Sequence, residues 1–392
     1  MLCGRRSSES RGDWLVLVAS LGLGGGIERY ADTVIRSLER LGHCVDVVAL
    51  RSHGAAPTAR TKARFLWHVF RALRDPSRKY QAVVVMHPSM YPAVSAVARL
   101  ARCSAPRFCF FFGHDIWSAP HRHLRRVRRT RARAVTISAF SSGALAARGV
   151  RADVLEPGLP RDWYDLLRSR TRPKAACADP STLHILMTFR LGQAVSKGAL
   201  RVIEASDRLR KAHPECAVRL LIAGTGSTPA VLINAATSRP WLQVVESPSD
   251  GQLAALYTSA DVFVLPTAIS LTRPYSGEGF GIVMGEAQLA GTPVIAPIFG
   301  GTASAFLPGI TGTALLTESV DELFSALEEF LLDRNRANAI ATNASAWAAA
   351  RFAPTTFDAA VRRVMMGEGG SRPLNLFVDP REGTREGDAT EQ

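Results

Sequence analysis

The sequence predicts an α/β protein in which two doubly wound domains face each other across a cleft. Apolar runs that read as buried strands alternate with segments of helical periodicity, which is typical of a parallel sheet covered on both faces. The alternation stops in a polar, basic segment and then begins again. With 392 residues, the chain is long enough to fill two hydrophobic cores.

The first half opens with the apolar run WLVLVASL and the glycine loop GLGGG. A helix is predicted from Ile27 to about Leu41, because Tyr30, Val34 and Leu38 fall on one stripe, and Gly42 ends it. Four further strands, each followed by helical sequence, are predicted at CVDVVAL, AVVVMH, FCFFFG and AVTIS.

From Asp162 to Pro180 the chain is polar and basic, and we interpret this stretch as the connection between the domains. The second alternation runs LHILMTF, a helix near 200–212, VRLLIAG, LQVVES, a helix at 251–259, DVFVLP, MGEAQLA as a helix, and TPVIAP. Helices are then expected in ELFSALEEFLL, through Arg351, and in PTTFDAAVRRVMM.

These elements give a predicted domain organisation, with a cleft where the carboxyl ends of both sheets meet. The predicted parts are a flexible N-terminus (1–13), a first Rossmann-like domain (14–165), a linker (166–181), a second Rossmann-like domain (182–350), a C-terminal helix that packs back on the first domain (351–366), and a disordered tail (367–392).

Cysteine usage and hydropathy predict a protein of the cytosol. The six cysteines form no CxxC pair and no Cys/His metal spacing, which argues against a disulfide framework and a zinc site. No stretch approaches the roughly 20 apolar residues that cross a bilayer, and the arginines at the N-terminus lead into a strand rather than a signal sequence.

The formal net charge of +14 is unevenly distributed. Nine arginines and a single acidic residue, Asp115, lie between Arg102 and Arg133, and HRHLRRVRRTRAR places arginines on every side of a predicted helix. Three explanations stay open: an anionic membrane or phosphorylated acceptor, a neutral compositional bias, and nucleic acid. Aromatic residues are not interleaved with the arginines, which disfavours nucleic acid.

Glu278 and Glu286 are the most informative pair in the sequence. Seven residues separate them in SGEGFGIVMGEAQLAGTPVI, where the glycines allow a ligand to approach the backbone and a helix begins. Two carboxylates around such a loop can bind the hydroxyls of a sugar and a ribose, while the helix N-terminus presents N–H groups to a phosphate. A solvated surface loop is the alternative.

Three other clusters fall at predicted strand ends. Gly24, Gly25 and Gly26 open the first helix, which suits a phosphate or a sugar but is equally typical of a tight turn. His114, after FCFFFG, is placed to hydrogen-bond a hydroxyl or to pack in a loop. Arg190 and Lys197 flank the loop after LHILMTF, where they could neutralise a diphosphate or be merely solvated.

With these motifs together, the chain resembles the retaining glycosyltransferases of the GT-B fold, family 4 (glycosyl transferases group 1). The resemblance runs from Trp14 to Met366 and is carried by EGFGIVMGEAQLAGTPVI, by SADVFVLPT and by GHD in the first half. It implies two facing Rossmann-like domains and no required metal. The chain contains no Asp-x-Asp motif.

The resemblance also implies residue roles. Glu286 would bind the ribose of a nucleotide sugar, and Glu278 would hold the sugar with the backbone of Gly279, Phe280 and Gly281. Arg190 and Lys197 would neutralise the departing diphosphate. The glycines at 24–26 and His114 would act from the first domain.

Two departures from the family pattern concern the basic pair. Phe189 stands where a glycine is usual, and RLGQAVSK is about two residues longer than common between Arg190 and Lys197. In ISLTRPYS, before the first glutamate, Arg273 is expected either to contact a ligand or to be solvated.

The expected function is transfer of a hexose from a GDP- or UDP-linked donor to a hydroxyl acceptor with retention, in bacterial polysaccharide biosynthesis. Expected acceptors are a lipid-linked or envelope glycan, at the inner face of the cytoplasmic membrane, or a small alcohol. Alternatives are a nucleotide-sugar 2-epimerase, glycosylation of a secondary metabolite, and a non-enzymatic nucleic-acid binder.

Overall fold

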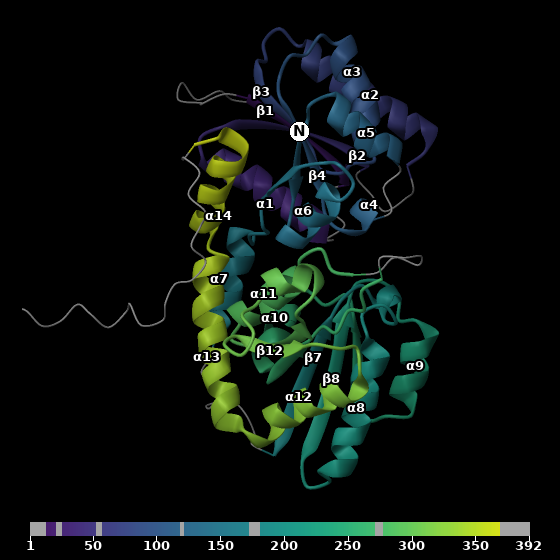
Figure 1. The fold of residues 1–392 in the computed structure, drawn as a ribbon, viewed down its shortest axis with the longest axis vertical. Coiled ribbons are helices and arrows are strands. Elements are labelled where there is room, and N and C mark those ends of the chain that lie inside the picture. Colours follow the sequence, from purple (N-terminus) through teal and green to yellow (C-terminus); the bar gives the residue numbers. More distant parts are fainter. Residues whose placement is uncertain are drawn as a thin grey trace, which may run out of the picture.

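The structure is a computed structural model and describes residues 13–20, 26–51, 57–117, 121–171, 181–270 and 277–368. It contains two lobes, each built on a sheet with helices on both faces (Figure 1). No helix within the described residues is both long and apolar enough to cross a membrane.

The first lobe is a six-stranded parallel sheet in the order β2-β1-β3-β4-β5-β6. Its elements are β1 (Asp13–Ser20), α1 (Gly26–Arg40), β2 (Cys44–Arg51), α2 (Ala59–Arg74), β3 (Tyr80–Val85), α3 (Tyr91–Leu100), β4 (Arg107–Phe111), α4 (His114–Trp117), α5 (His121–Arg129), β5 (Arg133–Thr136), α6 (Ala139–Ala146) and β6 (Ala152–Val154).

The second lobe is also a six-stranded parallel sheet, in the order β12-β11-β10-β7-β8-β9. The elements from here to the C-terminus are α7 (Arg161–Arg170), β7 (Thr182–Thr188), η2 (Leu191–Gln193), α8 (Ala199–Ala212), β8 (Ala217–Gly224), α9 (Ala230–Thr237), β9 (Leu242–Glu246), α10 (Asp250–Ser259), β10 (Val262–Val264), α11 (Ile282–Leu289), β11 (Val294–Pro297), η3 (Gly300–Ser304), β12 (Gly312–Leu315), α12 (Val320–Leu332), α13 (Arg334–Arg351), α14 (Pro354–Val361) and η4 (Arg362–Met366).

Local chemistry explains where several of these elements begin. Thr58 and Ser319 accept a hydrogen bond from the backbone three residues later and so cap α2 and α12. At α10, Ser249 and Gln252 form a reciprocal capping box. The central strands β1, β3 and β4 are buried almost throughout, as continuous apolar runs in a parallel sheet require. The predicted doubly wound fold is confirmed.

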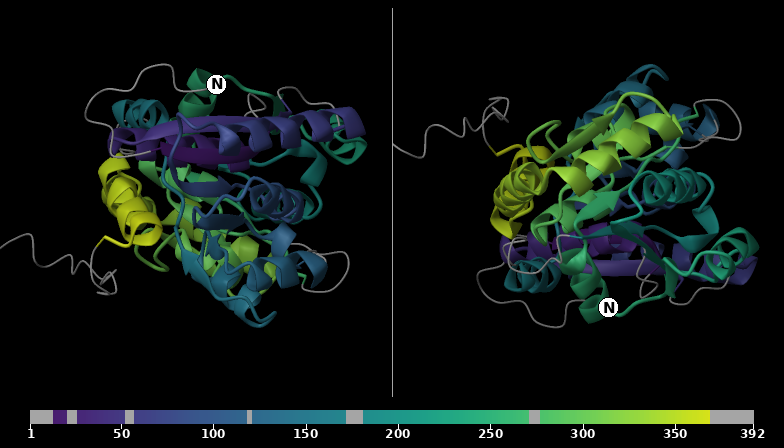
Figure 2. Two further views of the ribbon diagram at one scale, coloured as in Figure 1. Left: turned by 90° about the horizontal axis from the view of Figure 1, so that it is seen from above. Right: turned by 90° about the horizontal axis from the view of Figure 1, so that it is seen from below.

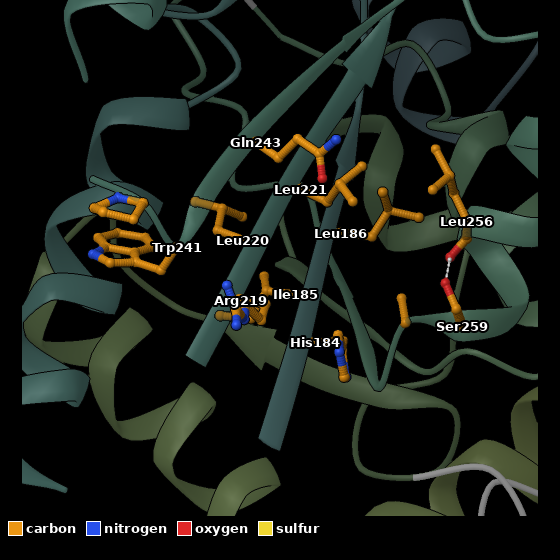
Figure 3. Close-up of a pocket in the computed structure, with 12 residues that line it drawn as sticks. His184, Ile185, Leu186, Arg219, Leu220, Leu221, Trp241, Gln243, Leu256 and Ser259 are labelled. Carbon is orange, nitrogen blue, oxygen red and sulfur yellow. Dashed lines mark hydrogen bonds between the residues drawn. The ribbon is translucent and has the colours of Figure 1, made fainter. Parts of the chain in front are cut away.

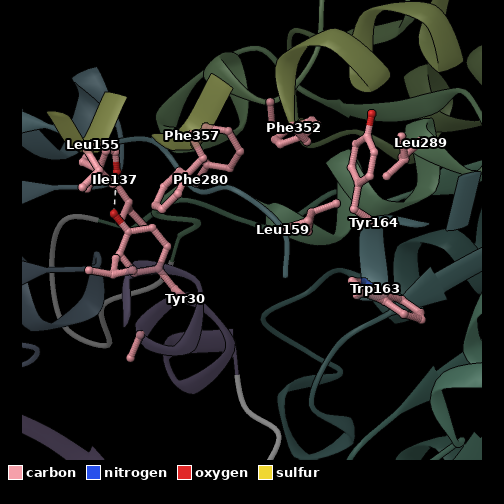
Figure 4. Close-up of a cluster of buried hydrophobic side chains, with 14 of the residues drawn as sticks. Tyr30, Ile137, Leu155, Leu159, Trp163, Tyr164, Phe280, Leu289, Phe352 and Phe357 are labelled. Carbon is pink, nitrogen blue, oxygen red and sulfur yellow. Dashed lines mark hydrogen bonds between the residues drawn. The ribbon is translucent and has the colours of Figure 1, made fainter. Parts of the chain in front are cut away.

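One hydrophobic cluster joins the two lobes (Figure 4). Tyr30 of α1 donates its hydroxyl to the Leu155 carbonyl at 2.8 Å and packs edge-on against Phe357, while Phe280 of the second lobe packs edge-on against Phe352. All of these aromatic side chains are buried. The lobes therefore share part of their core and are held close together at the cleft.

After α13 the chain returns to the first lobe, and α14 packs against α1 (Figure 1). Asp358 of α14 accepts hydrogen bonds from Ser37 and from both Nε and Nη2 of Arg40, at 2.5 to 2.9 Å. The pair is partly buried, which limits solvent screening. This polar contact and the aromatic cluster together attach the C-terminal helix to the first lobe.

Replacing Asp358 with Ala is expected to lower the free energy of unfolding by about 1.5 kcal/mol, because it removes charge-assisted bonds to Arg40 and one to Ser37. This change in the free energy of unfolding is measured by urea unfolding of the full chain. Asp321→Ala is the matched control, since Asp321 pairs with Arg208 while largely exposed, and it should change stability by less than about 0.5 kcal/mol. Equal effects from the two variants would contradict the role of Asp358.

The connection between the lobes includes a helix. Residues 166–170, predicted as linker, belong to helix α7, which buries Trp163, Tyr164 and Leu167. The apolar side chains of this helix recur at helical spacing within a sequence that is otherwise charged. Residues 172–180, the N-terminal residues 1–12 and the tail from 369 onward lie outside the described residues.

Candidate active site

A cavity of about 570 Å³ lies between the lobes, at the carboxyl ends of both sheets. This is the edge at which open α/β sheets bind ligands, and the volume suits a molecule of nucleotide-sugar size. Among the residues that line it are eight of the predicted site residues: Gly26, Arg190, Lys197, Glu278, Gly279, Phe280, Gly281 and Glu286. Residues far apart in the sequence therefore meet at one place.

Glu286, in α11, is only 4% exposed. Its Oε1 accepts a hydrogen bond from the indole N–H of Trp163 at 3.0 Å, and its Oε2 accepts one from the Tyr257 hydroxyl at 2.9 Å. Burial raises the pKa of this carboxyl above its ordinary value, and the nearby Arg29 guanidinium partly offsets that rise. Each carboxylate oxygen has a second lone pair, so Glu286 can still accept bonds from a ligand.

Glu278 forms an ion pair with Lys197 at the wall of the cavity. The Lys197 ammonium donates to Glu278 Oε1, and the Thr267 hydroxyl donates to the same oxygen at 3.2 Å. Both charged side chains are mostly buried, so each fixes the position of the other. An ammonium has three donors, and the pair can therefore present N–H groups to an anion while the carboxylate accepts from hydroxyls.

The glycines between the two glutamates bring the lobes into contact. A Cβ atom on Gly279 would overlap the carbonyl oxygen of Phe112, which directly follows β4. Cβ atoms essentially never come closer than 3.0 Å to such an atom, and this one would lie well within that distance. Gly281 caps α11 at φ +89°, a left-handed conformation that favours glycine. The backbone of this loop is therefore in close contact with the first lobe.

Arg190 follows β7 and lies exposed at the cavity wall. Among the described residues, its guanidinium makes no hydrogen bond or ion pair and is available to a ligand. The neighbouring turn is tight, because a Cβ on Gly224 would overlap the Phe189 carbonyl. The predicted basic pair, Arg190 and Lys197, therefore reaches one cavity despite the longer loop between them.

Arg29, in the first turn of α1, was not anticipated from the sequence. Its Nη2 donates to Asp250 Oδ1 of α10 at 2.8 Å, its Nη1 lies 3.8 Å from Glu286 Oε1, and its Cζ lies 5.3 Å from the Trp163 ring centroid. One side chain of the first lobe thus reaches the buried carboxylate of the second. The only feature of the sequence that could have indicated Arg29 is its position one turn after the glycine loop.

His87 and Asp115 line the first-lobe side of the cavity at the ends of β3 and β4. Asp115 accepts hydrogen bonds from the backbone N–H groups of Phe112 and Gly113, and burial raises its pKa. Burial lowers the pKa of His87, and the nearby Asp115 carboxyl partly offsets this shift. Because the Ser89 N–H donates to its Nδ1, the neutral ring carries its proton on Nε2.

Some predicted residues cannot be placed in this way. Gly24, Gly25 and Arg273 lie outside the described residues, and so does the side chain of His114, whose backbone begins α4. Pro248, in the loop expected to meet the base, lines the cavity. Within the described part of the chain, no three His, Cys, Asp or Glu residues are grouped to hold a metal ion.

A second, smaller pocket of about 90 Å³ lies on the second lobe around His184, Arg219 and Trp241 (Figure 3). It sits beside strands β7, β8 and β9 and includes none of the residues predicted for the site. Its size suits little more than a few water molecules, so the cavity between the lobes is the candidate site.

Two facing doubly wound domains with this cavity between them define the GT-B class of proteins. A solved structure of Anabaena HepE in complex with UDP and glucose superposes with a TM-score of 0.66, at 18% identity, over 90% of this chain and 99% of that one. Residues 183–347 match the sequence model of "Glycosyl transferases group 1". Residues 183–347 are therefore similar to this family, over less than half of the chain.

Two curated relatives illustrate the range of the family. D-inositol 3-phosphate glycosyltransferase of Corynebacterium aurimucosum is 31% identical over 191 residues, which are 47% of this chain and 44% of that protein. Against relatives of this kind, the matched region spans about half their length. GDP-mannose-dependent alpha-(1-6)-phosphatidylinositol monomannoside mannosyltransferase of Mycolicibacterium smegmatis is 27% identical over 89% of this chain and 96% of its own length.

Proposed function

We propose that this chain is a retaining glycosyltransferase that moves a sugar from a nucleoside diphosphate donor to a hydroxyl group. The observation that carries the proposal is the convergence of two carboxylates, Glu278 and Glu286, and two cations, Arg190 and Lys197, on one cavity between the lobes. Carboxylates bind sugar hydroxyls and the cations bind the diphosphate, so the cavity offers both ends of such a donor a partner.

In this proposal the ribose lies against Glu286. The carboxylate is held by Trp163 and Tyr257 and keeps one lone pair on each oxygen for the two ribose hydroxyls. Because the group is buried, each of these bonds forms away from water. The nucleobase lies toward Pro248, at the far side of the cavity.

The diphosphate lies between Arg190 and Lys197, and the sugar lies over Gly279–Gly281. As the bond from the sugar carbon to the phosphate oxygen breaks, negative charge grows on the leaving group, and both cations stabilise it. Glu278 holds Lys197 in place and accepts from the sugar hydroxyls. Backbone N–H groups at the start of α11 add to the stabilisation.

The acceptor hydroxyl approaches from the face that the phosphate is leaving, and its oxygen forms the new bond to the sugar carbon. Its proton passes to a phosphate oxygen of the departing nucleoside diphosphate, so no protein nucleophile is required. Retention of stereochemistry follows. The protein supplies positioning and charge stabilisation.

The acceptor enters from the first lobe, where His87 and the start of α1 line the cavity and where His114 and the glycines at 24–26 precede or open helices. A lipid-linked acceptor is favoured by the mannosyltransferase relative, whose name specifies a phosphatidylinositol monomannoside and whose length the chain covers almost fully. We accordingly place the enzyme in the cytoplasm, at the inner face of the membrane.

A thermal-shift panel of UDP-, GDP-, ADP- and dTDP-sugars tests donor binding, since a ligand that binds the native state raises the unfolding temperature. We expect the sugar of one nucleotide to raise the unfolding temperature more than the other three do. Incubation of that donor without acceptor then separates transfer from 2-epimerisation, because an epimerase needs no acceptor to turn over. No shift with any donor, or rapid epimerisation of donor alone, would overturn the proposal.

Substituting Arg190 with Ala is expected to lower kcat by roughly 100-fold, equivalent to about 2.7 kcal/mol of transition-state stabilisation, because one of the two cations at the diphosphate is lost. KM for the donor should change less. The measurement is steady-state transfer with the donor from the panel. Arg219→Ala, an exposed arginine on the outer side of the second sheet, is the control and should retain full activity.

A further inference from the structure

The first lobe has a strongly basic outer face formed by α2, α3 and α5, hereafter the basic face. These three helices lie side by side over one side of the sheet (Figures 1 and 2). They contain eleven Lys and Arg residues, five in α2, one in α3 and five in α5, and no Asp or Glu. By contrast α1, on the other side of the sheet, balances three basic residues with three acidic ones.

One stripe of α2 is both basic and exposed. Arg60, Arg64, Trp67, Arg71 and Arg74 follow a spacing of four and three residues, which places them on a single face of the helix. All five are exposed, and Trp67 is 61% exposed despite its size. A tryptophan centred among four arginines is typical of helices that lie in a membrane interface.

The neighbouring helices continue the same chemistry. Leu100 ends α3 and is 72% exposed, and Arg125 and Arg129 of α5 are exposed as well. The structure also corrects the expectation of arginines on every side of α5, because Leu124 and Val127 of this helix are buried. Leu124 and Val127 attach one side of α5 to the core, so the exposed arginines of this helix lie on its other side.

We propose that the basic face docks on an anionic lipid bilayer, with Trp67 and Leu100 entering the headgroup region. Each arginine near a negatively charged leaflet contributes attraction, and the two apolar side chains lose water at the interface. The proposal rests on the proposed function and extends it. It specifies which surface brings the enzyme to a lipid-linked acceptor.

The position of the cavity supports this orientation. His87 and Asp115, on the first-lobe side of the cavity, follow β3 and β4, and the same connections lead on into α3 and toward α5. The acceptor side of the cavity and the basic face are thus built from consecutive parts of the chain. The start of α3, which follows His87 closely in the chain, therefore joins the basic face to the acceptor side of the cavity.

The exposed apolar residues favour lipid over nucleic acid. A nucleic-acid surface gains affinity from phosphate contacts and from side chains that hydrogen-bond or stack with bases. Leu100 offers neither, and Trp67 stacks on its neighbour Phe70, with ring centroids 6.1 Å apart, rather than standing free for a base. Both side chains suit a membrane interface.

Vesicle co-sedimentation of the full chain tests the proposal. We expect binding to vesicles of phosphatidylcholine with phosphatidylglycerol, weak binding to phosphatidylcholine alone, and weakening of the former in high salt. A triple variant, Arg71→Glu, Arg125→Glu and Arg129→Glu, should lower partitioning onto the anionic vesicles by roughly 100-fold. Trp67→Ser should lower it by roughly tenfold.

The matched control reverses three exposed charges on the second lobe, Lys211→Glu, Arg219→Glu and Arg336→Glu, and so has the same net charge as the first triple variant. It should bind anionic vesicles almost as the wild type does. Equal loss in both triple variants, or wild-type binding to duplex DNA at the same salt concentration with none to vesicles, would overturn the proposal. Because donor-induced thermal shifts do not require vesicles, failure of docking and failure of the enzymatic function are distinguishable.

Discussion

Replacing Glu286 with Gln should lower kcat/KM by roughly 1000-fold, about 4 kcal/mol, while the protein becomes slightly more stable at neutral pH. In the proposed function the loss follows because two charge-assisted hydrogen bonds to the ribose are weakened at once. The fold tolerates the change. A glutamine oxygen can still accept from Trp163, and its amide can donate to the Tyr257 hydroxyl, which turns its own proton toward Thr188.

The gain in stability has a definite sign and pH range. Burial raises the pKa of Glu286 in the folded protein above its ordinary value of 4.5, so the folded state retains this proton to higher pH than the unfolded state does. As pH rises between these two values, the unfolded state releases the proton while the folded state keeps it, so the folded state loses stability relative to the unfolded state. Glutamine avoids this cost, and its advantage should disappear as pH falls toward 4.5.

Thermal unfolding of wild type and Glu286→Gln from pH 4 to 8 measures the difference, which should reach about 2 °C at neutral pH. Donor titration at each pH provides the functional comparison. Affinity of the wild type should fall at acid pH, beginning above the ordinary glutamate range, because a protonated carboxyl accepts fewer hydrogen bonds. A variant that is both active and less stable would contradict the assignment of Glu286.

Substituting Gly279 with Ala should reduce transfer at least roughly 1000-fold, although no charge is altered. The new methyl group would overlap the Phe112 carbonyl, so one lobe must move by more than about 1 Å. A displacement of that size typically costs about 100-fold in rate, and water entering between the separated lobes adds to the loss. The nucleotide half of the site, on the second lobe, stays intact.

Gly192→Ala is the matched control, because an added methyl group there meets no atom within 4 Å. This variant should keep wild-type activity. Isothermal titration with the free nucleotide should give near-normal affinity for both variants, since its contacts lie within the second lobe. Full activity of Gly279→Ala would show that the lobes do not approach each other as closely during catalysis as they do in this structure.

The fold was predictable from local patterns, because buried parallel strands appear as continuous apolar runs. WLVLVASL and FCFFFG became β1 and β4 within one or two residues. The three-residue strand β6 was not predicted, since its sequence ADV has no apolar run and its pairing with β5 depends on tertiary contacts. Short edge strands of this kind depend on the neighbouring strand for their identification.

The site was partly predictable, since motifs at strand ends mark one edge of a sheet. Glu278 and Arg190 could be placed in this way because each follows a recognisable loop or strand. Arg29 and Trp163 could not. Their importance arises from contacts over more than 120 residues, between Trp163 and Glu286, and over more than 220, between Arg29 and Asp250. A single sequence does not show which residues so far apart along the chain are in contact.

The chain crosses between the lobes twice, and the two crossings touch. Glu156 on the outward crossing pairs with Arg351 on the return, Gly158 lies so close to Phe357 that a Cβ would overlap the ring, and Tyr164 donates to the Ala349 carbonyl at 2.7 Å. Two lobes connected only along one line can still rotate about that line, so the two crossings together form a hinge axis. Since the residues from Pro157 to Pro160 also line the cavity, the axis of this rotation passes beside the cavity wall.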